Sequence, residues 1–197
     1  MSDDPMLKDR ADNVPGRAVH EWWRRSLGGH PNHDNGATRA ARARLRRAAS
    51  PADVLSLGVT HDLYHAILNA DGKRDLRHGE DGPVRLALIA SVLAAIEVHD
   101  GRSHLARRFG PSGREEQPAL SPLRFQRLLR APDNWRLSVA LRRALPLVGK
   151  TADVRALGAD LLFWGDRIRN RWCFEYFGTA PPAQFAQTPT TDESENA

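Results

Sequence analysis

Apolar residues recur at the spacing of an amphipathic helix along nearly the whole chain. Valine, isoleucine and threonine never gather into the alternating runs that are typical of strands. Serine followed by proline, at Ser50-Pro51 and again at Ser121-Pro122, indicates two helix starts in which serine is the N-cap. The pattern predicts an all-α, two-lobed helical bundle with about eight or nine helices and no sheet.

Two segments carry the largest apolar surfaces. The stretch from Val84 to about His99 is the most apolar, and it predicts the central helix of the first lobe. Residues 152–177 predict the longest helix, with Gly158 and Gly165 on its apolar stripe. Because glycine costs about 1 kcal/mol against alanine inside a helix, we expect close helix packing at both glycines.

The domain organisation follows from shifts in composition. Glycine, proline, serine and glutamate gather in residues 111–119, which predicts a linker. The linker separates an N-terminal helical lobe, residues 17–110, from a C-terminal helical lobe, residues 120–178. We expect the acidic ends, residues 1–16 and 179–197, to be loose and disordered.

Arginine supplies nearly all of the positive charge. The 197 residues hold 26 arginines and 3 lysines, and the formal net charge is +5. Residues 1–16 contribute −2 and residues 178–197 contribute −3, which leaves +10 on residues 17–177. The flat, forked donors of arginine suit phosphate oxygens, and its plane stacks on bases. The charge therefore favours a polyanionic partner, although a solvated helix face is the alternative.

The densest basic run, residues 36–48, holds five arginines and no carboxylate. Wound as a helix, it places alanines and Leu45 on one side and the arginines over the opposite arc. Two helices of the second lobe also carry arginines opposite an apolar side. The candidate phosphate-binding residues are Arg39, Arg42, Arg46, Arg47, Arg124, Arg127, Arg130, Arg142 and Arg143, with Arg169 and Arg171 as further candidates.

Several classes of protein are disfavoured by what the sequence contains. The single Cys173 excludes a disulfide framework and a multi-cysteine zinc site, and its aromatic neighbours predict a buried, inert thiol. The longest apolar stretch is interrupted by Arg85, Ser91 and Glu97, so it is too polar to span a bilayer. With no secretory-type apolar segment at its N-terminus, the chain is expected to be soluble and cytoplasmic.

Histidine and aspartate offer one enzymatic interpretation. His61 and His65 have the spacing of metal ligands on a helix, and His61-Asp62 and His99-Asp100 are similar to the paired ligands of HD phosphohydrolases. Histidines without a metal are the favoured alternative. No Ser-His-Asp set, paired carboxylates or glycine-rich nucleotide loop stands out. We therefore predict a protein that is not an enzyme and uses no cofactor or metal.

The adjacent tryptophans Trp22 and Trp23 allow two interpretations. They could form a platform on which bases stack. Tryptophan flanked by Val19 and Leu27 on a helix is more typical of a core, and at least one of the pair is expected there.

A set of motifs follows in order between Val19 and Gly178. They are Trp22-Trp23, then Arg42-Ala-Arg-Leu-Arg-Arg-Ala48 with Ser50-Pro51, Leu120-Ser-Pro-Leu-Arg-Phe-Gln-Arg-Leu-Leu129, Leu141-Arg-Arg-Ala-Leu145, and Leu161-Leu-Phe-Trp-Gly-Asp166 running to Trp172-Cys-Phe-Glu-Tyr176. In this order they resemble the CasB family, the small helical subunit of the type I-E CRISPR surveillance complex Cascade. Cys173 takes a position that is usually small in the family, and the acidic tail is an extra.

The resemblance implies a non-enzymatic, two-lobed helical subunit, present as a pair along the inner side of the complex. Its implied partners are the other Cascade subunits, the guide RNA, the target and displaced DNA strands, and a second copy of the chain. Exchange of a DNA duplex for a guide–target duplex is nearly balanced in energy. Contacts from arginines to the backbone can therefore decide whether the R-loop persists.

The sequence also allows two further alternatives. A stand-alone helix-turn-helix regulator would need mixed polar base-reading residues, whereas these basic helices are almost pure arginine and alanine. A structural spacer would use its arginines to pair with acidic faces of neighbouring proteins.

Overall fold

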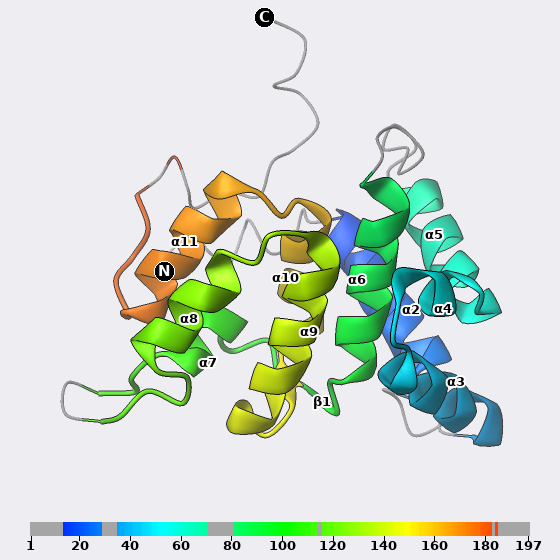
Figure 1. Cartoon of the computed structure of the whole chain (residues 1–197), viewed down its shortest axis with the longest axis horizontal. Coiled ribbons are helices and arrows are strands. Elements are labelled where there is room, and N and C mark those ends of the chain that lie inside the picture. Colours follow the sequence, from blue (N-terminus) through cyan, green and yellow to red (C-terminus); the bar gives the residue numbers. More distant parts are fainter. Residues whose placement is uncertain (1–13, 29–34, 71–80, 114–115, 183, 185–197) are drawn as a thin grey trace, which may run out of the picture.

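The computed structural model describes residues 14–28, 35–70, 81–113, 116–182 and 184. In this part of the chain the helices are α2 (Val14–Ser26), α3 (Gly36–Arg47), α4 (Pro51–Leu55), α5 (Gly58–Ala70), α6 (Gly82–Ala94), α7 (Leu105–Phe109), α8 (Pro122–Leu129), α9 (Asn134–Ala144), the 3-10 helix η2 (Leu145–Val148), α10 (Val154–Leu162) and α11 (Asp166–Tyr176) (Figure 1). The predicted all-α class is confirmed. Most of the expected loose N-terminus and acidic tail lies outside the described residues.

A short parallel strand pair corrects the expectation that the chain has no sheet. Strand β1 (Val98–His99) pairs with β2 (Thr151–Ala152). The Asp100 amide extends the ladder by donating to the carbonyl of Ala152 at 3.0 Å. Two-residue strands are too short to leave an alternating pattern in the sequence. The pair ties the segment after α6 to the segment before α10.

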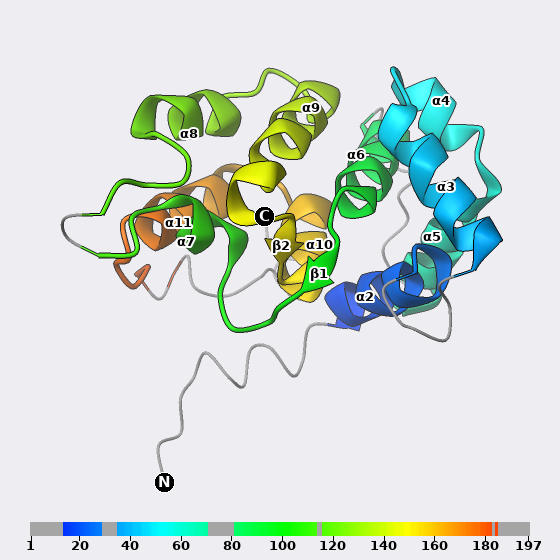
Figure 2. The same ribbon diagram turned by 90° about the horizontal axis from the view of Figure 1, so that it is seen from below.

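Helix α6 is the centre of the core, as the apolar stretch predicts. Every residue from Leu86 to Ala94 is buried. The helix contacts α3, α4, α5, α9 and α10, which surround it in Figures 1 and 2. Between α6 and α9 the buried hydroxyls of Ser91 and Ser138 hydrogen-bond at 2.8 Å, so the polar groups at this interface are satisfied.

The predicted single helix over residues 152–177 is wrong, because the chain forms two helices there. Helix α10 ends at Leu162, and Gly165 is the N-cap of α11. At Gly158 a Cβ would lie 2.6 Å from Cγ1 of Val19, which confirms the close packing expected there. At Gly165 the nearest atom to a Cβ would be the Phe163 carbonyl oxygen at 3.7 Å, so close packing is not the reason for that glycine.

One hydrophobic cluster runs through both halves of the chain. Helix α2 packs against α10, and α6 packs against α9. After the segment 111–119, the Leu120 amide donates to the carbonyl of Phe109 at 3.0 Å. The Tyr176 hydroxyl then donates to the carbonyl of Leu120 at 2.6 Å. Helices on both sides of the segment therefore share one core.

Candidate nucleic-acid interface

Two of the candidate arginines on α3 bind the end of the central helix. Arg42 Nε donates to the Ala94 carbonyl at 3.2 Å, and its Nη2 donates to the carbonyl of Ile96. Arg46 Nε donates to the same Ala94 carbonyl at 2.8 Å. Carbonyls at a helix C-terminus lack partners within the helix and carry partial negative charge. Both guanidinium groups therefore cap α6.

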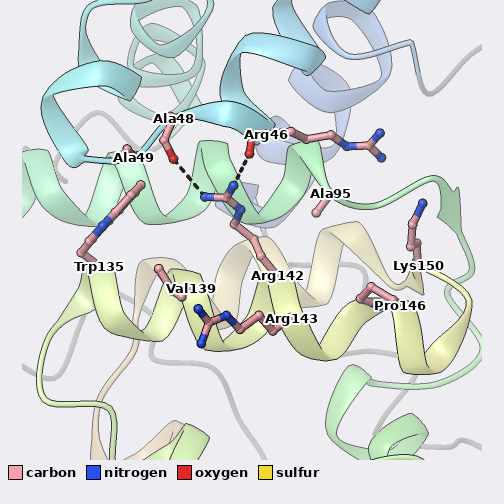
Figure 3. Close-up of a pocket in the computed structure, with 10 residues that line it drawn as sticks. All are labelled: Arg46, Ala48, Ala49, Ala95, Trp135, Val139, Arg142, Arg143, Pro146 and Lys150. Carbon is pink, nitrogen blue, oxygen red and sulfur yellow. Dashed lines mark hydrogen bonds between the residues drawn. The ribbon is translucent and has the colours of Figure 1, made fainter.

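Arg142 of α9 caps α3 in the same way. Its guanidinium donates to the main-chain carbonyls of Arg46 and Ala48, where α3 ends (Figure 3). Burial of this group lowers the pKa of Arg142 from its ordinary value. Arg85 of α6 makes a third such cap, donating to the carbonyl of Leu162 at the end of α10 at 2.9 Å. Several arginines thus hold helix ends together.

The two further candidates on α11 make contacts within the protein. Arg171 is 3% exposed and forms ion pairs with Asp160 and Glu175. This places Arg171 in the core and away from any basic surface, so we leave it out of the interface. Arg169 is partly exposed, pairs with Asp166 at 2.8 Å and lies over the ring of Trp164.

The remaining candidates are on the surface. Arg124, Arg127 and Arg130 are exposed along α8, opposite the buried side chains Phe125 and Leu128. Arg39 and Arg47 of α3 and Arg143 of α9 are exposed too. Two more exposed arginines on the same helices, Arg44 and Arg136, were not among the candidates, although their helical register predicts exposure.

These helices lie together on one side of the molecule. Figure 2 shows α8, α9 and the α3–α4 pair along its upper edge, with α2 on the opposite side, and Figure 1 shows the same three parts in front. We call the following exposed residues the arginine edge: Arg44, Arg47, Arg124, Arg127, Arg130, Arg136 and Arg143. In the described part of the chain, no hydrogen bond or ion pair engages the side chains of this set.

A groove of about 520 Å³ lies within the edge, between α9 and the end of α3 (Figure 3). Its small apolar residues are Ala48, Ala49, Ala95, Val139 and Pro146. Its cations are Arg46, Arg142, Arg143 and Lys150, and Trp135 closes one end. The lining of the groove therefore combines small apolar side chains with four cations.

Trp135 is the groove residue that sequence reasoning missed. The two tryptophans weighed as a stacking platform, Trp22 and Trp23, are 1% exposed and belong to the core. Their indole N–H groups donate to the carbonyls of Val59 and Leu93. Trp135 is only partly buried. The available signal was its place in the first turn of a basic helix, next to Arg136.

Two of the candidate histidines, His61 and His99, lie within hydrogen-bond distance of main-chain groups. His99 Nδ1 accepts a hydrogen bond from the Val154 amide at 3.1 Å, and Asp100 forms ion pairs with Arg102 and Arg108. Hydrogen bonds from these two arginines hold the pKa of Asp100 well below its usual range. His61 Nε2 lies 2.9 Å from the Leu55 carbonyl oxygen. In the described ranges, no three His, Cys, Asp or Glu residues are grouped to hold a metal ion.

Stability is expected to fall in mild acid because of His20. Burial, together with the neighbouring His99 and Arg24, lowers the pKa of His20 from 6.5 to about 4. The unfolded chain therefore binds the proton first as the pH falls below 6.5, and the loss of stability is complete near pH 4. We expect a loss of about 1–2 kcal/mol, reduced from the full shift because the ring is partly exposed.

Urea unfolding of the wild type and of His20→Leu at several pH values measures this effect. The variant should lose less stability than the wild type between pH 6.5 and about 4. If the free energy of unfolding changes with pH in the same way for both proteins, His20 contributes nothing to the pH dependence.

Cys173 is partly buried, and burial raises the pKa of its thiol. A raised pKa lowers the fraction of reactive thiolate, which is the direction expected for an inert thiol. Among the described residues, none of the helices has both the length and the apolar character needed to span a membrane.

These features define a class of small helical proteins in which arginine both caps helix ends and supplies an exposed basic edge. The family model described as CRISPR-associated protein Cse2 matches residues 41–177, so the chain belongs to that family, which confirms the resemblance to CasB. The family is one of structural subunits of the type I-E Cascade complex. Searches of curated proteins and of solved structures found no match to the chain.

Proposed function

We propose that this chain is a non-catalytic Cascade subunit that binds the nucleic-acid backbone through the arginine edge and so stabilises the R-loop. The observation that carries the proposal is the arginine edge itself, exposed on α3, α8 and α9 and engaged by no hydrogen bond or ion pair within the described residues. Uncompensated cations on rigid elements attract a polyanion. Arg39, also exposed on α3, extends the edge.

The proposal divides the candidate arginines by role. Arg47, Arg124, Arg127, Arg130 and Arg143 contact phosphates. Arg42, Arg46 and Arg142 hold the helices that present them, because their guanidinium groups donate to main-chain carbonyls. Arg169 contributes only in part, since it already pairs with Asp166.

The proposed ligands are the guide–target region and the displaced DNA strand. A second copy of the chain, the guide RNA and the other Cascade subunits are its proposed neighbours, in the cytoplasm. Contacts to the backbone carry no sequence information. A subunit that uses them serves any guide.

Charge reversal on α8 tests the proposal. In guide-loaded Cascade reconstituted with Arg124→Glu/Arg127→Glu, we expect the R-loop lifetime on a matched target to fall about tenfold or more, because phosphate contacts are replaced by repulsion. The slope of log affinity against log salt should become shallower by roughly 1.5–2, as two phosphate contacts are lost. R-loop lifetime and DNA affinity are measured at two or more salt concentrations.

A matched control exists on α2. Arg17→Glu/Arg25→Glu makes the same change in charge at two exposed arginines on the opposite side of the molecule. This control should leave lifetime and slope near their wild-type values. If both variants lose R-loop lifetime and DNA affinity equally, the change in net charge alone explains the effect. If the α8 variant binds DNA as the wild type does but fails to assemble into the complex, the α8 arginines pair with neighbouring proteins. The chain would then be a structural spacer.

A further inference from the structure

We propose that the groove between α9 and the end of α3 holds one unpaired base of a single strand, stacked on Trp135. The inference rests on the proposed function and adds to it a base-binding subsite within the arginine edge. The groove volume of about 520 Å³ lies in the range of small-ligand sites, about 300–1,000 Å³.

Trp135 is suited to stacking because the fold leaves it available. The chain has five tryptophans, and the other four are between 0% and 7% exposed. Trp135 is only partly buried, and its ring stands at one end of the groove beside Ala49 (Figure 3). A flat aromatic ring of this kind stacks on any base, since every base has a π-face.

The short apolar side chains of the groove suit the face of a flat ring. Ala48 and Ala49 line it on the α3 side and Val139 on α9 (Figure 3). Arg142, which also lines the groove, reaches from α9 to the main-chain carbonyls at the end of α3. This arrangement fixes the distance between α9 and α3. The opening is therefore maintained by the fold.

The charges around the groove select an anionic occupant. Arg46 and Lys150 both pair with the single carboxylate of Glu97, at 3.0 and 2.8 Å. Arg143 is exposed, and among the described residues no ion pair engages it. The lining therefore keeps an excess of positive charge next to small apolar side chains and an aromatic ring. An unpaired nucleotide offers the matching phosphate and flat base in one unit.

The test compares two oligonucleotides that carry equal charge. The full-length chain is titrated with an oligothymidylate and with an abasic oligonucleotide of the same length. We expect the wild type to bind oligothymidylate more tightly. Trp135→Leu fills similar apolar space without a ring and should weaken oligothymidylate binding about five- to a hundredfold. The same variant should leave abasic binding and the salt slope unchanged, and Trp135→Phe should keep most of the base-dependent gain.

The other outcomes separate this subsite from the proposed function. Equal wild-type affinities for the two oligonucleotides, or equal losses of both in Trp135→Leu, overturn the stacking subsite. If Arg124→Glu/Arg127→Glu still weakens both ligands, the arginine edge remains the binding surface. A third outcome is that oligoglutamate binds more tightly than oligothymidylate and that this binding depends on Trp135. The groove would then bind an acidic protein segment, which also overturns the subsite.

A ribose version of the probe identifies the kind of strand. Oligouridylate and oligothymidylate share the pyrimidine face and the phosphate charge, so both should show the gain that depends on Trp135. A gain confined to either one assigns the groove to RNA or to DNA.

Discussion

Replacing Asp160 with alanine is expected to lower the free energy of unfolding by about 3–5 kcal/mol. Asp160 is 3% exposed, and its two carboxylate oxygens accept hydrogen bonds from Arg171 and from the indole N–H of Trp172. Removing the carboxylate takes away the closer of the two ion pairs of the buried Arg171 guanidinium and leaves the pair with Glu175, at 3.4 Å. Removing one partner of a buried, hydrogen-bonded charge network costs far more than a surface ion pair contributes.

The matched control is Asp166→Ala, which removes an ion pair from the surface of the same helix pair. The Asp166 side chain is 89% exposed and pairs with Arg169 at 2.8 Å. We expect this variant to stay within about 1 kcal/mol of the wild type. Urea unfolding of the three proteins under one set of conditions measures the difference. If Asp160→Ala lowers the free energy of unfolding by less than Asp166→Ala does, the buried network does not stabilise the fold.

Gly110→Ala is expected to destabilise the protein by about 3 kcal/mol or more. A Cβ at Gly110 would lie 1.8 Å from the carbonyl oxygen of Tyr176 and 2.7 Å from its carbonyl carbon. These are backbone atoms of α11, so no side-chain rotation relieves the clash. Tyr176 also stacks on Phe125 with ring centroids 4.2 Å apart. Moving α11 away from α7 therefore disturbs α8 as well.

Gly58→Ala is the control for this prediction. A Cβ at Gly58, the first residue of α5, would meet nothing within 4 Å. Alanine there should leave stability unchanged or raise it by up to about 1 kcal/mol. Thermal and urea unfolding of both variants measure the contrast. Similar stabilities for the two alanine variants would show that α7 and α11 separate without cost.

Helical periodicity predicted the class of fold and the central place of α6, because both depend on spacing along the chain. The break between α10 and α11 was missed because the apolar stripe continues through it in register. Close packing was predicted for two glycines on that stripe and found at Gly158, where α2 crosses. The position of α2 is a tertiary fact that periodicity does not contain.

The candidate site was predictable to the same degree. Periodicity predicted which arginines lie opposite the apolar side of each helix. For Arg124, Arg127 and Arg130 it correctly predicted that the side chains are exposed. It did not show that Arg46 and Arg142 meet the ends of other helices. Sequence reasoning also proposed the paired tryptophans Trp22 and Trp23, and not Trp135, as candidates for stacking. Trp135 acquires its place only when α3 packs beside α9.

The arginines that cap α3, α6 and α10 also shape the electric field outside the protein. The C-terminus of a helix carries about half a negative elementary charge, and such an end near the surface repels a passing phosphate. Arg42, Arg85 and Arg142 each place a full positive charge on one of these ends. The guanidinium group stays protonated at every physiological pH. The capped ends therefore add no negative potential to the surface around them.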